Sequence, residues 1–121
     1  MKPMIELDKQ LGVVRAKTKG SFTMQELDKS MEELKKLFLN MDKKLLLADV
    51  RENDRVMATK EERVRMRELS KDLTWDKAAV VGADTLVRMS AKIVLAAIGL
   101  SKTTRFFKTE DEALRWLKEK P

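Results

Sequence analysis

Apolar residues repeat along this chain with two different periods, and each period indicates a different kind of element. After residue 23 they recur every three or four positions, the spacing of one helix face; this set is Leu27, Met31, Leu34, Phe38 and Met41. Two short runs, Leu45–Ala48 and Ala78–Val81, are instead apolar at every position. A strand that is apolar on both sides must be covered on both faces, so these runs predict the sheet of an α/β protein.

Capping residues mark where the helices begin. Three helices are expected to open with a capping box, in which a threonine hydroxyl accepts from the amide three residues on and a glutamate reaches back; the pairs are Thr23–Glu26, Thr59–Glu62 and Thr109–Glu112. A fourth helix is expected to begin at Asp84 or Thr85 and to end near Gly99. Further strands are expected at 4–8, 13–18 and 103–107, and a charged loop at 50–58. The sequence predicts one α/β domain over residues 1–121, in the order ββαβαβαβα.

The residue types that are missing exclude several classes of catalytic and metal-binding site. The 121 residues include no cysteine, which excludes disulfides and thiolate metal sites. They include no histidine either, which excludes imidazole ligands and the histidine bases of Ser-His and Cys-His catalysis. Without a glycine-rich phosphate-binding motif, we expect no nucleotide cofactor. The composition therefore predicts a protein that is not an enzyme and has no metal or cofactor.

Charge and hydropathy bear on partners and location. The net charge is +6, but the 26 basic residues are spread among 20 acidic ones and aromatic residues make up only 5%. A nucleic-acid surface would interleave basic runs with exposed aromatics, so we expect no nucleic-acid partner. The N-terminus lacks the apolar core of a signal peptide, and the longest apolar stretch, 93–100, is too short to span a membrane. We therefore expect a cytoplasmic protein without a transmembrane segment.

Four segments carry a resemblance that covers nearly the whole chain. They are Gly20-Ser21-Phe22-Thr23, Leu45-Leu46-Leu47-Ala48-Asp49, Ala79-Val80-Val81-Gly82, and Arg105-Phe106-Phe107 followed by Glu112-Ala113-Leu114-Arg115-Trp116-Leu117. As a set they resemble the SpoIIAA-like branch of the STAS domains, the anti-sigma-factor-antagonist fold. This resemblance implies a five-stranded, mixed, mostly parallel sheet whose first strand is antiparallel at the edge, with four helices packed around it.

The same resemblance sets expectations for regulation and ligands. Signalling STAS domains carry a phosphorylatable serine in an Asp-Ser-x-Gly-like turn after the strand that matches Leu45–Asp49. Here the turn from Asp49 to Thr59 contains neither serine nor glycine. This departure argues against a kinase-driven switch and leaves Thr59, the nearest hydroxyl, as the candidate phosphosite. The SpoIIAA-like branch is also similar in architecture to Sec14-type lipid-binding domains.

The helix expected at 85–99 is more apolar than packing on a sheet requires. Its polar or open positions fall on one narrow side at about 100° per residue, whereas a helix lying on a sheet needs an apolar stripe only somewhat wider than about 100°. The remaining apolar surface of this helix is either covered by neighbouring helices of the same chain, or it contacts a partner subunit, an apolar ligand or a membrane surface. For a partner or ligand contact, the predicted residues are Val87, Ala91, Val94 and Ile98.

The helix before it carries cations along one side, namely Lys60, Arg63, Arg67 and Lys71. Arg63–Arg67 and Arg67–Lys71 are like-charge pairs four residues apart, each of which costs about 0.3 kcal/mol of helix stability. The row is either a solvated face balanced by nearby glutamates or a surface for an anionic partner, such as a phosphorylated protein or a lipid headgroup.

Asp49 and Asp84 are the candidates for chemistry, because they follow strands that are predicted to be adjacent, where ligands of open α/β sheets gather. Two carboxylates are able to hold Mg²⁺ or exchange protons, but each also suits a turn or helix cap, and no third ligand is evident. The sequence therefore predicts a non-catalytic regulatory or protein-interaction module that forms a homodimer, or binds another protein, through helix 85–99. The alternative is a small apolar-ligand or lipid-binding protein with that helix as its pocket wall.

Overall fold

The strands and helices follow one another in the order expected from the sequence. The computed structural model describes residues 4–20, 23–53 and 59–119. The strands are β1 (Met4–Asp8), β2 (Val13–Gly20), β3 (Leu45–Asn53), β4 (Lys77–Val81) and β5 (Thr104–Phe107). The helices are α1 (Met24–Leu39), α2 (Lys60–Leu69), α3 (Thr85–Ile98) and α4 (Glu110–Leu117), with a 3₁₀ turn at Ser101–Thr103 before β5. The predicted order ββαβαβαβα is confirmed.

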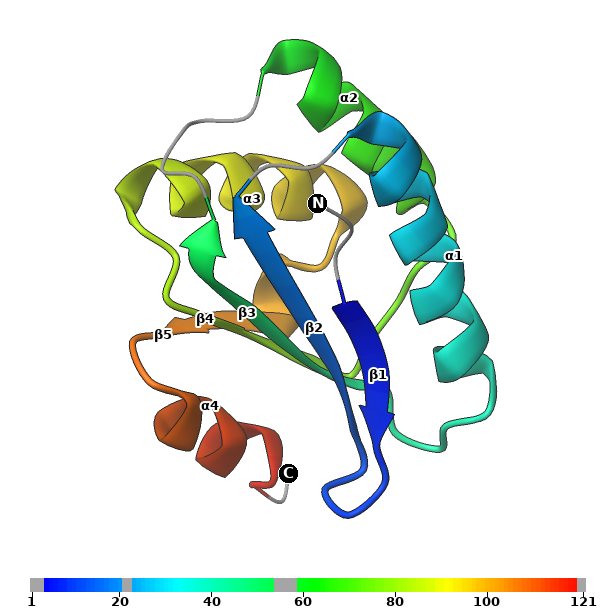
Figure 1. Cartoon of the computed structure of the whole chain (residues 1–121), viewed down its shortest axis with the longest axis vertical. Coiled ribbons are helices and arrows are strands. Elements are labelled where there is room, and N and C mark those ends of the chain that lie inside the picture. The colour runs from blue at the N-terminus through cyan, green and yellow to red at the C-terminus, as the bar shows by residue number, and fades with distance from the viewer. Residues whose placement is uncertain (1–3, 21–22, 54–58, 120–121) are drawn as a thin grey trace.

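The strands form one sheet in chain order, β1-β2-β3-β4-β5 (Figure 1). β1 is antiparallel to β2 at one edge, and the other three pairings are parallel. A helix crosses over between the strands of each parallel pair, as parallel strands require. One row of partners, Val14–Leu46–Ala78–Thr104, gives the register from β2 to β5. The expected mixed, mostly parallel sheet is therefore confirmed.

Helices α1, α2 and α3 lie on one side of the sheet. Leu34 and Phe38 of α1 pack against Val14 and Leu46 in one buried cluster. On the same side, α3 approaches β5, where the Lys92 ammonium lies 5.9 Å from the centre of the Phe106 ring. α2 contacts both α1 and α3 and lies between them (Figure 1).

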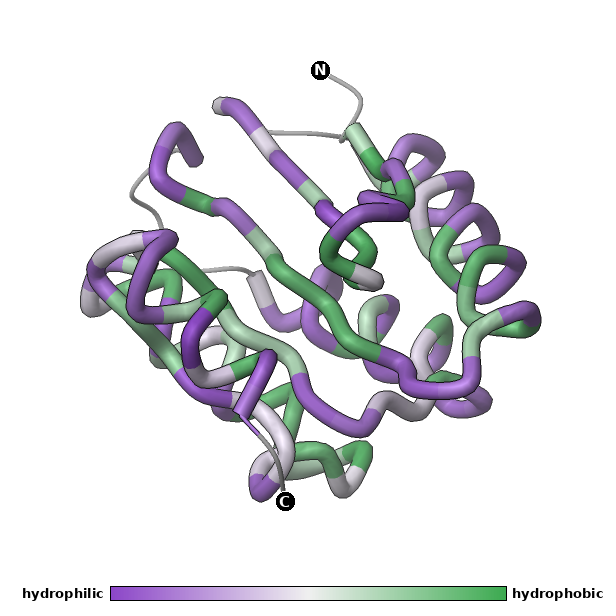
Figure 2. The backbone as a smooth tube through the Cα atoms, turned by 90° about the horizontal axis from the view of Figure 1, so that it is seen from below, coloured by the Kyte–Doolittle hydropathy of each residue, from purple (hydrophilic) through white to green (hydrophobic). Residues whose placement is uncertain are grey.

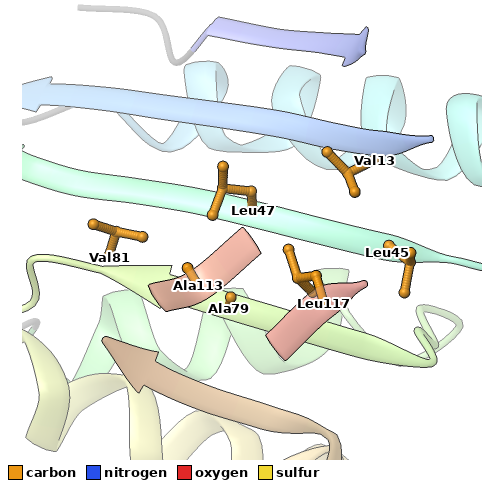
Figure 3. Packing of buried hydrophobic residues seen from close by; sticks show 7 residues of the cluster. All are labelled: Val13, Leu45, Leu47, Ala79, Val81, Ala113 and Leu117. Atoms are coloured by element: carbon orange, nitrogen blue, oxygen red, sulfur yellow. The ribbon is translucent and has the colours of Figure 1, made fainter. Parts of the chain in front are cut away.

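The other face is covered by α4, the only described helix on that side. Figure 3 shows the buried cluster that joins α4 to three strands, consisting of Val13, Leu45, Leu47, Ala79, Val81, Ala113 and Leu117. Successive residues of a strand point to opposite faces, so Leu46 faces α1 while Leu47 faces α4. Burial on both faces explains why the two runs are apolar throughout, and the middle of the sheet is correspondingly hydrophobic in Figure 2.

β3 is longer than the sequence predicts. The segment 50–53, expected to be part of a charged loop, continues the strand because it pairs with the end of β2, with Lys19 beside Glu52 and Gly20 beside Asn53. Lys17 Nζ lies 3.0 Å from Glu52 Oε2, and the Thr18 hydroxyl donates to Asn53 Oδ1. Such cross-strand pairs allow a charged segment to stay in the sheet.

Candidate interaction surface

Helix α3 is fixed at both ends by its own sequence. Asp84 caps the first turn by accepting a hydrogen bond from the Val87 amide at 2.9 Å. Gly99 ends the helix with φ 78°, a conformation that side chains with a Cβ disfavour. Between these ends α3 buries Ser90, Val94 and Leu95. The side of α3 that carries these three residues faces the protein, and the opposite side faces solvent.

Three large apolar residues lie on that solvent side. Leu86, Met89 and Ile93 are 41%, 48% and 48% exposed. Their spacing of i, i+3 and i+7 places them in one line along the helix, which we call the apolar stripe. A contiguous line of exposed apolar side chains is typical of a contact surface, whereas single exposed ones are common everywhere on proteins.

A groove of about 110 Å³ lies between α2 and α3 at the Ile93 end of this stripe, and we call it the α2/α3 groove. Its apolar lining comes from both helices and consists of Val64, Ile93, Val94 and Ala97. The charged residues that line it, within the part of the chain described, are all cationic: Lys60, Arg63 and Arg67. The two surfaces that the sequence suggested separately, an apolar helix and a basic helix, therefore meet in one place.

Two more cations border the apolar stripe on its other side. At about 100° per residue, Arg88 and Lys92 fall on the side of the stripe that is turned away from the groove, and both are exposed. The sequence of α3 contains no aspartate or glutamate. The apolar stripe thus has Arg88 and Lys92 on one side, and the three α2 cations lie beside its Ile93 end on the other.

Helix α2, the other wall of the groove, makes a two-bond polar contact with α1. None of its residues is fully buried. Its Arg65 donates two hydrogen bonds to the Asp28 carboxylate of α1, with Nη2 2.9 Å from Oδ2 and Nε 3.3 Å from Oδ1. These bonds link α2 to α1 and so help to position the helix that forms one wall of the groove.

The four α3 residues predicted to contact a partner or ligand lie on the side of the helix that faces its own chain. Val94 is buried, and Val87, Ala91 and Ile98 are half-buried. Val94 nevertheless contributes to the floor of the α2/α3 groove. A contact through these four residues stays a prediction. The exposed apolar stripe was visible in the sequence as an i, i+3, i+7 pattern, but choosing it requires knowing which side of α3 meets the sheet.

The remaining predicted residues lie at the two ends of α2. Thr59 is exposed and caps α2, accepting from the Glu62 amide at 3.1 Å, and Lys71 is exposed in the turn after the helix. Phosphorylation of Thr59 stays a prediction. Ser21 and Phe22, and residues 54–58 of the turn before Thr59, lie outside the described residues.

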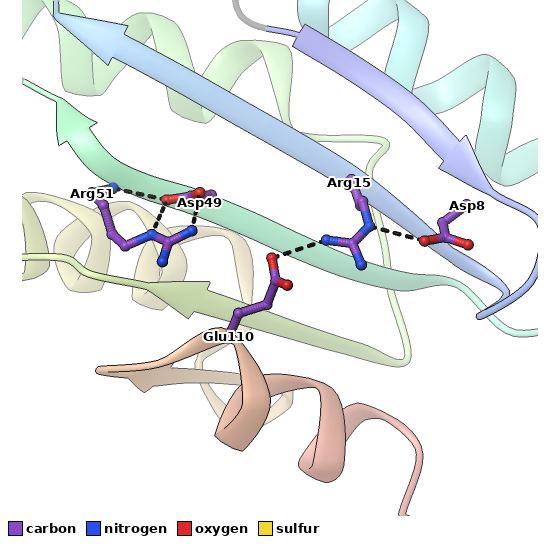
Figure 4. Close-up of polar contacts among 5 residues, drawn as sticks. All are labelled: Asp8, Arg15, Asp49, Arg51 and Glu110. Carbon is purple, nitrogen blue, oxygen red and sulfur yellow. Dashed lines mark hydrogen bonds and ion pairs between the residues drawn. The ribbon is translucent and has the colours of Figure 1, made fainter.

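The two aspartates that the sequence suggests for chemistry are both engaged in structural contacts, and Asp49 lies within β3 and not after it. Asp49 accepts from Arg51, with Oδ2 2.7 Å from Nη2 and Oδ1 3.0 Å from Nε (Figure 4). This side-chain hydrogen bonding holds the pKa of Asp49 below its ordinary value despite partial burial. Asp84 caps α3. Within the described residues, no group of three aspartate, glutamate, histidine or cysteine side chains is placed to hold a metal ion.

A second polar group on the α4 side links three elements. Arg15 of β2 donates from Nε to Asp8 of β1 at 3.0 Å and from Nη1 to Glu110 of α4 at 2.9 Å (Figure 4). The hydrogen bond from Arg15 is the largest cause of a lowered pKa at Asp8. With both carboxylates committed to one guanidinium, this group ties the sheet edge to α4 and has no free acid or base.

Comparison with known proteins points to one family. The family model for SpoIIAA-like proteins matches residues 13–118. An uncharacterised protein from Shewanella loihica with a SpoIIAA-like fold is similar in structure, with a TM-score of 0.69 and 17% sequence identity over 95% of this chain and 91% of that chain. No curated protein matches the sequence. Within the described residues, no helix is both long and apolar enough to cross a membrane.

Proposed function

This chain belongs to the SpoIIAA-like family, and from that premise we propose that it is a non-catalytic regulatory module that binds another protein through the apolar stripe and the α2/α3 groove. The observation that carries the proposal is the exposure of Leu86, Met89 and Ile93 in one line along α3. Leaving three large apolar side chains together in water is unfavourable, and a protein partner would bury them.

A lipid carrier fits this surface less well. Pockets for small apolar ligands have volumes of about 300–1,000 Å³ and enclose most of the ligand. The α2/α3 groove has about 110 Å³, and the neighbouring hollow beside Val64 and Arg65, at about 290 Å³, is open to solvent. Grooves of this size accept side chains from a protein surface more readily than a whole acyl chain.

A homodimer through α3 is the second candidate, and the apolar stripe favours it. In a two-fold dimer the same patch meets itself. Arg88 and Lys92 of one copy would then lie close to the same cations, or to Lys60 and Arg67, of the other. Like charges facing each other across a contact weaken it, so a different protein fits this surface better than a second copy.

The test is site-specific photo-crosslinking in the cells from which the protein comes. A photoreactive amino acid replaces Met89 in the apolar stripe, and a matched control variant carries it at Lys36, an exposed position of α1. We expect the variant at position 89 to form a discrete adduct with a different protein, the control to lack that adduct, and Ile93→Glu to remove it. An adduct of twice the chain mass would support the homodimer. If position 89 yields no more adduct than position 36, the proposal is wrong.

A further inference from the structure

We infer that the partner presents an acidic amphipathic helix, whose apolar side chains enter the α2/α3 groove and whose flanking carboxylates face the two rows of cations. This inference rests on the proposed function and adds the chemistry of the partner segment. It is carried by charge complementarity and by the geometry of the apolar stripe.

Within the part of the chain that the structure describes, the charged residues identified on both sides of the stripe are cations. Lys60, Arg63 and Arg67 line the groove side, and Arg88 and Lys92 border the other side. Glu61 of α2 lines the neighbouring hollow beside Val64 and Arg65 and not the α2/α3 groove, and the other two acidic side chains of α2 make other contacts. Glu62 closes the helix cap by accepting from the Thr59 amide at 2.9 Å, and Glu68 lies 3.6 Å from Arg65. A docking segment with carboxylates on both edges would therefore meet cations on both edges.

The length and shape of the stripe fit a helix. Leu86 and Ile93 are seven positions apart, which at about 1.5 Å per residue is about 10 Å, or two helical turns. A partner helix with apolar residues at i, i+3 or i+4, and i+7 presents a line of the same length. An added strand is a poor fit, since it needs unpaired backbone groups, whereas the backbone groups within α3 bond to one another.

The cation rows also attract anionic membranes, so the test must separate the two partners. A flat bilayer surface would contact Leu86 and Met89 but leave the recess beside Val64 and Ala97 unfilled. A helix side chain is able to fill this recess. For this reason the observations favour a protein helix over a lipid surface.

The experiment measures fluorescence anisotropy of three labelled peptides of about 16 residues. All three are designed as helices. The first has a leucine stripe flanked by glutamates, and the second has the same stripe flanked by lysines. The third keeps the glutamates but has alanine in place of each leucine. The protein variants are Lys60→Glu/Arg67→Glu and the matched control Lys29→Glu/Lys36→Glu, which makes the same change in net charge at exposed positions of α1. Circular dichroism checks that each variant is folded.

We expect the glutamate-flanked leucine peptide to bind the unaltered protein at least about tenfold more tightly than the other two peptides. Lys60→Glu/Arg67→Glu should weaken binding of this peptide about fivefold, and the α1 control should weaken it less than about twofold. Raising the salt concentration from about 50 mM to about 500 mM should weaken it as well. Equal binding of the glutamate- and lysine-flanked peptides, or equal losses in the two double variants, would overturn the inference.

Two further results separate this inference from the proposed function and from membrane binding. If the adduct at position 89 forms in cells and survives Lys60→Glu/Arg67→Glu, the protein partner is real but is not held by charge, and only this inference fails. If vesicles of phosphatidylcholine and phosphatidylserine in equal parts bind through Lys60 and Arg67 while no peptide binds, the surface is a membrane contact and this inference is wrong.

Discussion

Arg51 lies directly across Gly82 at the carboxyl end of the sheet. The Asp49 carboxylate holds the Arg51 guanidinium by two hydrogen bonds, so the side-chain stem is drawn over the turn after β4. A Cβ at position 82 would collide with Arg51 Cγ and lie 3.1 Å from Arg51 Cα. Gly82 also has φ 80° and donates from its amide to Phe107 at 2.9 Å. A side chain at position 82 therefore requires both a positive φ and a shift of Arg51, which favours glycine in this turn that leads into α3.

We expect Gly82→Ala to lower the free energy of unfolding by about 2–4 kcal/mol, because it adds a contact with Arg51 to the cost of a positive φ. Gly99→Ala is the matched control, since Gly99 has φ 78° and nothing within 4 Å of an added Cβ. Gly99→Ala should lower the free energy of unfolding by about 1 kcal/mol. Urea unfolding of both variants measures the difference. Equal losses would mean that Arg51 moves aside without cost.

Acid should destabilise the protein through two aspartates. Contacts with arginine lower the pKa of Asp8 and the pKa of Asp49 below the ordinary value of 3.8. A carboxyl whose pKa is lower in the folded state stabilises that state above its unfolded pKa and loses this contribution as protons bind. The contribution of these two aspartates to stability should therefore be constant above about pH 5 and fall as the pH drops below about 4.

The Asp49–Arg51 pair should account for part of this fall. Asp49→Asn should flatten the pH dependence of the free energy of unfolding between about pH 4 and pH 2. Arg51→Met should do the same, because the hydrogen bonds from Arg51 are the main cause of the lowered pKa. In the Arg51→Met background, Asp49→Asn should then have little further effect on the slope. Independent effects of the two substitutions would show that this pair does not control the slope.

Helix α2 should be the least protected of the three helices on its side of the sheet. It buries no residue fully, whereas α1 buries Leu27, Ser30, Leu34 and Phe38. Amide hydrogen exchange should therefore be faster in α2 than in α1 or α3. Arg65→Met removes the bonds to Asp28 and should speed exchange in α2 by up to about fivefold, since a partly exposed ion pair contributes at most about 1 kcal/mol. Arg67→Met is the control. Protection of α2 equal to that of α1 would contradict this account.

Local signals in the sequence were sufficient for most of the fold. The boxes at Thr23 and Thr59 begin α1 and α2 in the structure, because capping depends only on residues three positions apart. The end of β3 was not predictable in this way. Segment 50–53 is strand because β2 lies beside it, and pairing between strands distant in the sequence leaves no local pattern.

The orientation of α3 likewise depends on contacts that are distant in the sequence. Because α3 is apolar around most of its circumference, its sequence does not show which side of the helix is buried. The sequence therefore favours Val87, Ala91, Val94 and Ile98 as the contact residues of α3, whereas in the structure these four are buried or half-buried and Leu86, Met89 and Ile93 are exposed. The positions of α2 and the sheet decide between the two sets, and those positions come from tertiary packing.

Adjacent residues of α3 provide the sharpest test of that orientation. Ile93 is 48% exposed and Val94 is 8% exposed, since neighbouring positions on a helix differ by about 100°. Ile93→Glu should change the free energy of unfolding by less than about 1 kcal/mol, because its carboxylate remains in water beside the groove cations. Val94→Glu places a carboxylate at a nearly buried position on the groove floor and should lower the free energy of unfolding by about 2 kcal/mol or more. Urea unfolding compares the two variants, and Ile93→Gln controls for charge. A folded Val94→Glu together with an unfolded Ile93→Glu would place the buried side of α3 on the opposite face, and the apolar stripe would then belong to the core.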